Sequence, residues 1–333
     1  MSLLEVRDLR LDFPSARGIV HPVDGVSFRI ERGEVMALVG ESGCGKSLTS
    51  LALLRLVPPP GRIADGSRIL LEEIDLLGLP EKEIRAVRGG RIGMVFQDPM
   101  TSLNPVLTAG DQIVETIRAH RNISRREARD SAIRLLTEVG IPDPAGRFHA
   151  YPHQLSGGLR QRVMIAIALA AEPALLIADE PTTALDVSVQ AQILELLDRL
   201  RQTHGMAVLL ITHDLGVVAG RADRVAVMYA GQIVETAPTE MLFQRPSHPY
   251  TQALFASIPR LDGPVGRLQP IPGSVPQPAA WPTGCRFHPR CEFVFEPCAD
   301  HVPPMFEPGQ AHQAKCWLLD PERQAAGPRI FAS

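Results

Sequence analysis

Residues 34–47 read EVMALVGESGCGKS, a short apolar run followed by a glycine-rich turn. The apolar run at 34–39 predicts a buried β-strand, and the glycines after it predict a tight turn into a helix that begins near Lys46. Backbone amides can surround a phosphate only where side chains do not intrude, and a helix N-terminus adds favourable partial charge. The stretch therefore predicts a phosphate-binding loop made by Gly40, Glu41, Ser42, Gly43, Cys44, Gly45, Lys46 and Ser47.

Charged and polar groups at this loop and at a later strand end suit nucleotide chemistry. Lys46 is placed to reach the β- and γ-phosphates as a point charge, and the Ser47 hydroxyl is placed to ligate Mg²⁺. Asp179 ends an apolar run, where a rigidly held carboxylate positions Mg²⁺, usually through water. Glu180 follows it directly and suits general-base work, although a solvated pair at a helix start before Pro181 is the alternative.

The remaining pattern predicts a parallel α/β core with a helical insertion. Residues 3–13 and 23–30 alternate as strands of an antiparallel sheet do, whereas residues 105–150 have helical periodicity. Strand and helix then alternate again. The expected elements of this later part are strands at 91–97, 174–178, 207–212 and 224–229 and a helix at 187–203.

Composition limits what the chain can do alone. Its 333 residues can bury one or two sizeable cores, and a net charge of −3 indicates no nucleic-acid partner. The longest apolar run, at 163–171, is shorter than the roughly 20 residues that a membrane-spanning helix needs. The charged N-terminus lacks a secretory signal. We therefore expect an intracellular protein whose membrane role, if any, comes through a partner.

The C-terminal part carries a proline-rich segment and then four cysteines. Prolines between 259 and 282 exclude regular helix there and suggest a boundary. The thiols suit a [4Fe–4S] cluster, while zinc sites usually have closer cysteine pairs, and unligated thiols are a further alternative. The histidines nearby, His288, His301 and His312, are expected at the surface. The cysteines are Cys285, Cys291, Cys298 and Cys316.

Five motifs in a fixed order resemble the nucleotide-binding subunit of an ATP-binding-cassette (ABC) transporter. They are GESGCGKS at 40–47, Gln97 in VFQDP, LSGGLRQR at 155–162, LLIADEP at 175–181 and His213 in ITHD. Further segments resemble the oligopeptide/dipeptide importer branch of these ATPases. They are QDPMTSLNPVLT at 97–108, PSHPY at 246–250 and GCRFHPRC at 284–291.

The resemblance implies roles for individual residues. It makes Glu180 the group that polarises the attacking water, Gln97 a contact to Mg²⁺ and that water, and His213 a hydrogen-bond partner of the γ-phosphate. Phe13 stands where the family often stacks an aromatic ring on adenine, although a core-facing strand residue is an equal alternative.

The resemblance also implies a head-to-tail dimer of ATPase subunits. The LSGG segment of one subunit, here Ser156, Gly157 and Gly158, closes over the ATP of the other, and Asp186 lies at the seam. A plain helix cap is the alternative for Ser156. The implied partners are a second ATPase, expected to make a heterodimer, two membrane permeases and, indirectly, a substrate-binding protein.

The fold class expected is α/β, a P-loop ABC ATPase core with a mainly parallel sheet, an antiparallel β subdomain, a helical subdomain at about 98–160 and a small cysteine-containing extension. The domains expected are a nucleotide-binding domain at 1–258, a proline-rich linker at 259–284 and the extension at 285–333. The expected function is ATP- and Mg²⁺-dependent import of dipeptides or oligopeptides, at the cytoplasmic face of the membrane. In some dipeptide-importer ATPases matching cysteines hold an iron–sulfur cluster. Nickel or glutathione import, and a soluble ABC ATPase without transport, are the alternatives.

Overall fold

The computed structural model describes residues 2–16, 18–183, 185–257 and 271–324, and the chain forms two compact units. The first unit comprises Met1–Leu4, Arg29–Val35 and Leu70–Ile211. The second comprises Glu5–Phe28, Met36–Ile69 and Thr212–Ser333. Part of the proline-rich segment, residues 258–270, and the last residues, 325–333, lie outside the described residues.

Parallel strands form the centre of the first unit. Strand β8 (Leu175–Asp179) lies between β7 (Ile92–Val95) and β9 (Ala207–Thr212), with Asp179 opposite Ile211 and Ala178 opposite Val95. All three are buried along their lengths, as strands covered on both faces are. The expected strands at 91–97, 174–178 and 207–212 are therefore confirmed, with shifts of a few residues at their ends.

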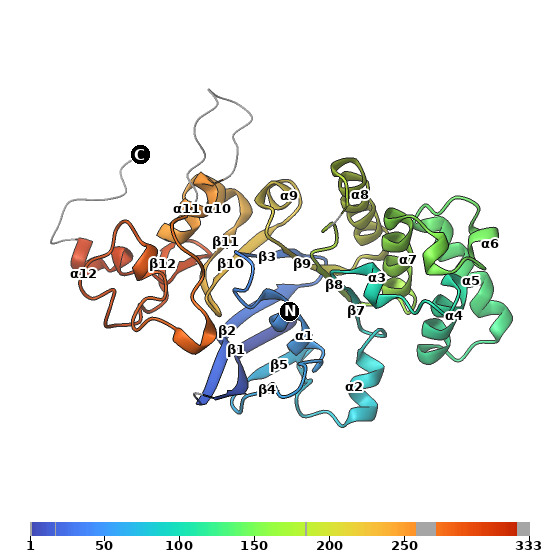
Figure 1. The fold of residues 1–333 in the computed structure, drawn as a ribbon, viewed down its shortest axis with the longest axis horizontal. Helices are drawn as coiled ribbons and strands as arrows, with labels where there is room; N and C mark the ends of the chain where they lie inside the picture. The colour runs from blue at the N-terminus through green and yellow to red at the C-terminus, as the bar shows by residue number, and fades with distance from the viewer. Residues whose placement is uncertain (1, 17, 184, 258–270, 325–333) are drawn as a thin grey trace. The chain divides into compact units, whose positions relative to one another are not determined.

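Helices make up most of the rest of the first unit, and Figure 1 shows α4, α5 and α6 gathered beside α7. The helical periodicity expected at 105–150 is confirmed there, and α5 begins with a capping box in which Ser124 and Glu127 satisfy each other's backbone amides. These helices are α2 (Glu81–Val87), α3 (Pro99–Ser102), α4 (Ala109–His120), α5 (Arg125–Glu138), α6 (Pro144–Arg147), η1 (Pro152–Gln154), α7 (Gly157–Leu169) and α8 (Val187–His204).

The second unit holds a mixed sheet. Strand β10 (Arg224–Tyr229) runs parallel to β3 (Val35–Val39) and antiparallel to β11 (Gln232–Pro238), so that Val39 lies opposite Val227. The same sheet continues from β11 into β13 (His312–Ala314) and β12 (Phe306–Gly309), which the sequence pattern did not predict. The cysteine-bearing tail thus pairs with the core of the second unit.

The N-terminal strands belong to a second sheet, as the alternating N-terminal pattern predicted. They are β1 (Ser2–Ser15) and β2 (Gly18–Glu31), which run from one unit into the other, as does β5 (Arg68–Leu71). Within the second unit β1 pairs with β4 (Arg62–Ile63), and within the first β5 pairs with β6 (Ile74–Asp75). The second unit's helices are α1 (Lys46–Leu53), α9 (Leu215–Ala219), α10 (Thr239–Gln244), α11 (Pro249–Ala256), η2 (Pro278–Ala280), η3 (His288–Arg290), η4 (Trp317–Leu319) and α12 (Pro321–Gln324).

The core of the second unit reaches into the tail. Phe287 is only 2% exposed and packs edge-on against Tyr229, with ring centroids 5.2 Å apart, and against Tyr250 at 5.4 Å. Aromatic pairs at these separations add to the free energy that burial of their apolar area contributes. The tail therefore shares the core behind β3 and β10 and needs no separate core of its own.

Candidate functional site

The glycines of residues 40–47 are required by backbone conformation and by close packing. Gly40 has φ +155° and Gly45 has φ +111°, regions that other residues rarely adopt. A Cβ atom at Gly40 would lie 2.2 Å from the Met228 carbonyl oxygen, and one at Gly45 would lie 2.8 Å from that of Pro22. The loop consequently passes directly over its neighbours, and helix α1 begins at Lys46 as predicted.

Lys46 is folded into this loop. Lys46 is 5% exposed, and its Nζ donates hydrogen bonds to the carbonyl oxygens of Gly40 at 2.8 Å and Glu41 at 3.1 Å. The ammonium group is therefore held at the loop backbone, beside the N-terminus of α1, where both contribute positive potential. Cys44 is fully buried beneath the loop, and its thiol lies 3.8 Å from Lys46 Nζ.

Glu41 is held by two side chains that the motif does not contain. Its backbone N–H donates to the Tyr250 hydroxyl at 2.9 Å, and its carboxylate oxygens accept from Arg290 at 2.9 and 3.0 Å. Burial raises the pKa of Tyr250, which keeps that hydroxyl protonated. Tyr250 and Arg290 belong to the PSHPY and GCRFHPRC segments, which sequence analysis used only as family markers.

The first unit brings Glu180 and Gln97 together at the ends of parallel strands. Asp179 is 4% and Glu180 9% exposed. Glu180 Oε2 accepts from Gln97 Nε2 at 3.2 Å and from the Thr183 hydroxyl at 2.8 Å, while its N–H donates to Ile211 O at 2.9 Å. Glu180 also has φ +47°, a strained conformation for a glutamate that costs about 1 kcal/mol or more. Thr183 was not singled out from the sequence.

The LSGG segment lies at the N-terminus of α7, as predicted. Ser156 is the N-cap residue, and its hydroxyl accepts from the N–H of Leu159 at 3.4 Å. Ser156 and Gly157 are exposed. The start of α8 lies beside this segment, since Val189 Cγ1 is so close that a Cβ at Gly158 would lie 2.9 Å from it.

Asp186 caps that second helix. Its carboxylate accepts from Ser188 Oγ at 2.7 Å and from the N–H of Val189 at 2.9 Å, and these hydrogen bonds lower the pKa of Asp186. The structure therefore places the LSGG segment and Asp186 at neighbouring helix starts of the first unit.

His213 and Phe13 lie in the second unit. His213 is exposed and directly follows β9, which ends at Thr212. Phe13 is half-buried on β1, and its ring covers Gly61, where a Cβ would lie 2.3 Å from Phe13 Cζ. Gly61 therefore makes room for the Phe13 ring.

The four tail cysteines line one small pocket, together with residues that include His248 and Phe287. Backbone N–H groups donate to three of the sulfurs: those of Phe287 and His288 to Cys285, that of Phe293 to Cys291 and that of Leu318 to Cys316. Burial, with the three neighbouring thiols, raises the pKa of Cys316 to about 12. Nevertheless, within the ranges that the structure describes, no group of three or more His, Cys, Asp or Glu side chains is arranged to hold a metal ion.

The expectation that His312 lies at the surface was wrong. His312 is 2% exposed, and its Nε2 lies 2.7 Å from Oε1 of Glu235, a fully buried residue of β11. The other Glu235 oxygen accepts from the N–H of His248 at 2.9 Å. His312 is buried because β13 pairs with β11, a contact between segments far apart in sequence.

A glycine loop with a buried lysine, and carboxylates at the ends of parallel strands, define a P-loop ATPase. The chain belongs to the ABC transporter family: the family model for ABC transporters matches residues 23–183. The model for the oligopeptide/dipeptide transporter C-terminal region matches residues 234–298. The resemblance and the ABC ATPase activity expected from the motifs are confirmed at this level.

Curated relatives match over nearly the whole chain. The chain is 51% identical to the oligopeptide transport ATP-binding protein AppD of Bacillus subtilis over 96% of its own length and 98% of that protein. It is 49% identical to the dipeptide transport ATP-binding protein DppD of the same organism, over 97% of each chain.

Solved structures confirm the fold class. The dimeric structure of MJ0796, a bacterial ABC transporter cassette, superposes with a TM-score of 0.63 at 28% identity and covers 71% of this chain and 98% of its own. A post-hydrolysis dimer of the same cassette bound to ADP and Pi has a TM-score of 0.62, with 71% of this chain and 98% of that one covered at 27% identity.

Proposed function

We propose that this chain is the ATPase subunit that powers the import of dipeptides or oligopeptides through a membrane ABC transporter. The observation that carries the proposal is that both parts of the chain match: the cassette at 23–183 and the oligopeptide/dipeptide C-terminal region at 234–298. Relatives about half identical to it over nearly their full lengths are named for oligopeptide and dipeptide transport. Nickel and glutathione remain the alternative cargoes, and a soluble ABC ATPase the alternative class.

The phosphate loop of the second unit would bind the nucleotide. Lys46 would neutralise the β- and γ-phosphates, the amides of residues 40–47 would surround them, and Ser47 would ligate Mg²⁺. His213 would contact the γ-phosphate from the end of β9. Phe13 would stack on adenine, although its packing over Gly61 equally supports the alternative structural role.

The carboxylates at the end of β8 would carry the chemistry of hydrolysis. Asp179 would position Mg²⁺ through water, and Glu180 would polarise the attacking water as general base. The hydrogen bond from Gln97 to Glu180 supports a shared task, since a group that contacts both Mg²⁺ and the water must stand beside the base. The strained backbone of Glu180 is of the kind that proteins keep at functional positions.

A second ATPase subunit would complete each site. The exposure of Ser156 and Gly157 supports a role outside the chain, because ordinary capping needs only the Ser156 side chain. Ser156, Gly157 and Gly158 would close over ATP held by the partner, with Asp186 at the seam. ATP would thus stabilise the closed dimer, since a ligand shifts an equilibrium only through its different affinities for the two states. We expect a heterodimer.

Exposed apolar residues after Gln97 support docking to the permeases. Met100 is 61% and Val106 75% exposed, in the QDPMTSLNPVLT segment of the first unit. No described helix of this chain is long and apolar enough to cross a membrane. The chain would sit at the cytoplasmic face of the membrane, bound to two permeases and indirectly to a substrate-binding protein.

The domain boundaries proposed are a nucleotide-binding domain at 1–258 with its helical subdomain at about 98–160, a linker at 259–284 and the extension at 285–333. Within the extension, a [4Fe–4S] cluster on Cys285, Cys291, Cys298 and Cys316 is supported by the donor set, by the shared pocket and by N–H groups directed at sulfur. The described side chains do not form a ligand set, and zinc remains the alternative. Anaerobic purification with iron, sulfide and zinc analysis tests this, and colourless protein with zinc or no metal would refute the cluster.

Transport by the reconstituted complex tests the main proposal. The chain would be co-expressed with any second ATPase subunit, permeases and binding protein that are encoded beside it, and ATP-dependent uptake of labelled dipeptide, oligopeptide, nickel and glutathione would be measured in proteoliposomes. We expect peptide uptake that Glu180→Gln abolishes. Uptake of nickel or glutathione alone would move the chain to the alternative cargo, and ATPase activity without any such genes beside it would contradict the transporter class.

A further inference from the structure

A tail arginine makes a bidentate ion pair with the phosphate loop. Arg290 ends η3, directly before Cys291, and its two terminal nitrogens donate to the two carboxylate oxygens of Glu41 at 2.9 and 3.0 Å. The Arg290 side chain is 6% exposed and that of Glu41 28% exposed, so this pair is far better shielded than a surface salt bridge. Paired hydrogen bonds between a guanidinium and a carboxylate fix geometry as well as charge.

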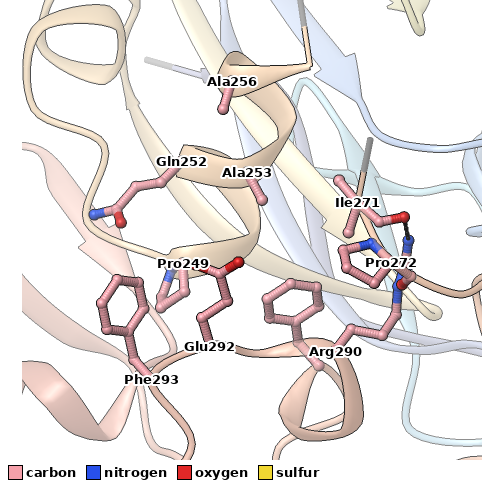
Figure 2. Close-up of a pocket in the computed structure, with 10 residues that line it drawn as sticks. Pro249, Gln252, Ala253, Ala256, Ile271, Pro272, Arg290, Glu292 and Phe293 are labelled. Carbon is pink, nitrogen blue, oxygen red and sulfur yellow. Dashed lines mark hydrogen bonds between the residues drawn. The ribbon is translucent and has the colours of Figure 1, made fainter. Parts of the chain in front are cut away.

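The rest of the Arg290 guanidinium is tied to the second unit as well. Nε donates to Pro272 O at 2.7 Å, Nη2 to Ile271 O at 3.4 Å and Nη1 to the Tyr229 hydroxyl at 3.3 Å. Figure 2 shows Arg290 beside Ile271 and Pro272 at the edge of a pocket that α11 also lines. All five N–H donors that an arginine carries are used.

Glu41 is the loop residue through which this anchoring reaches the nucleotide site. Its N–H is held by Tyr250, its carboxylate by Arg290, and its carbonyl oxygen accepts from Lys46 Nζ at 3.1 Å. It directly follows Gly40, whose φ of +155° sets the entry into the loop. Movement of Glu41 would therefore move both the loop backbone and the partner of Lys46.

We propose that Arg290 is a positioning residue that holds the phosphate loop in its nucleotide-binding shape, so that the docked tail sets the affinity of the subunit for ATP. The proposal rests on ATP binding by residues 40–47, which the wild-type protein tests in the same experiment. Arg290 acts through Glu41 and has no contact with substrate in this role.

The test uses the full-length subunit with Arg290→Gln, Arg290→Lys and Glu41→Gln. Equilibrium binding of Mg·ATP and steady-state KM and kcat are measured, with circular dichroism and melting temperature as checks of folding. We expect Arg290→Gln to weaken ATP binding about 5- to 30-fold, the factor for an interaction of one to two kcal/mol, and to raise KM while kcat stays within about twofold. Arg290→Lys should restore part of the affinity, because lysine keeps the charge but lacks the fork.

A double-mutant cycle separates coupling from general damage. If Arg290 acts on the loop through Glu41, Glu41→Gln alone should weaken ATP binding similarly. The double variant Arg290→Gln with Glu41→Gln should then bind ATP no more weakly than either single variant. Additive losses of ATP affinity would contradict the proposal that Arg290 acts through Glu41. Should Arg290→Gln fail to fold, Glu41→Gln with the tail intact still decides, since unchanged ATP affinity there contradicts the proposal.

Arg286 provides a matched control in the same tail. It forms an ion pair with Asp24 and donates to Ala230 O, and its guanidinium lies 4.7 Å from the Trp281 ring. None of these three partners belongs to the phosphate loop. Arg286→Gln should lower the melting temperature yet leave ATP affinity within about twofold. Equal loss of affinity from Arg286→Gln and Arg290→Gln would mean that any loosening of the tail suffices, and would overturn the role of Arg290. Wild-type protein that binds no ATP would instead refute the ATPase assignment.

Discussion

The phosphate loop and the LSGG segment are both glycine-containing helix starts, and they are built in opposite ways. The loop at 40–47 lies over Met228 and Pro22, holds a buried Lys46 and is backed by Tyr250 and Arg290. The LSGG segment is exposed at Ser156 and Gly157, and the Ser156 side chain caps α7. One glycine-containing helix start is therefore packed against and hydrogen-bonded to other parts of its unit, whereas the other is exposed at its first residues.

The largest effect should come from adding one methyl group to each segment. In Gly40→Ala the new Cβ meets Met228 O at 2.2 Å at a φ that alanine rarely adopts, so we expect ATP binding to be lost. In Gly157→Ala the nearest atom, Leu185 Cδ2, lies at 3.6 Å, an ordinary contact. The Gly157→Ala subunit should therefore fold and bind ATP but show reduced ATPase activity. Nucleotide titration and turnover check both variants, and equal ATP binding by the two would contradict the different packing of the two segments.

Removal of the base should separate binding from chemistry. Glu180→Gln keeps the size of the side chain but removes its basicity, so we expect turnover to fall about 10²- to 10⁴-fold while ATP binding persists. With the second ATPase subunit present, the closed dimer should then accumulate, as sedimentation with ATP would show. Glu195→Gln, at an exposed glutamate of α8, is the control and should match the wild type. Unchanged turnover in Glu180→Gln would remove that residue from its role.

The support behind the phosphate loop should be measurable as stability. Phe287→Ala removes a ring that is 2% exposed between Tyr229 and Tyr250, and such truncations cost about 3–5 kcal/mol. Phe293 is 37% exposed, so Phe293→Ala should cost much less. Chemical denaturation followed by tryptophan fluorescence and circular dichroism compares the two, and equal losses would contradict the core placement of Phe287.

The smallest effect is expected at the helix cap of the LSGG segment. Ser156→Ala removes the acceptor of the Leu159 amide, which should lower the free energy of unfolding by about 1 kcal/mol. If Ser156 also contacts ATP of a partner, its loss should weaken ATP-induced dimerisation in the Glu180→Gln background. Ser131→Ala, within α5, is a control without a cap to lose. Unaltered dimerisation would leave Ser156 with the capping role alone.

Strands and helix starts were predictable because their signals are local. The apolar runs at 174–178, 207–212 and 224–229 became β8, β9 and β10, and the Ser156 cap marked the start of α7. The strand ends at Asp179 and Thr212 likewise placed Glu180 and His213 beside parallel strands. The prediction failed in the tail, where His312 was expected at the surface but is buried against Glu235 by strand pairing.

The ATPase class, the glycine loop at 40–47 and the strand ends before Glu180 and His213 could be predicted from the sequence, because glycine spacing and hydrophobic period act over a few residues. The long-range contacts appear only in the folded chain: Arg290 forms an ion pair with Glu41, Phe287 packs against Tyr229 in the core, and His312 is buried. The Arg290–Glu41 pair is separated by 249 residues, and no local pattern encodes such a contact. It forms because the β12–β13 strands and the aromatic core dock the tail onto the unit that contains the phosphate loop.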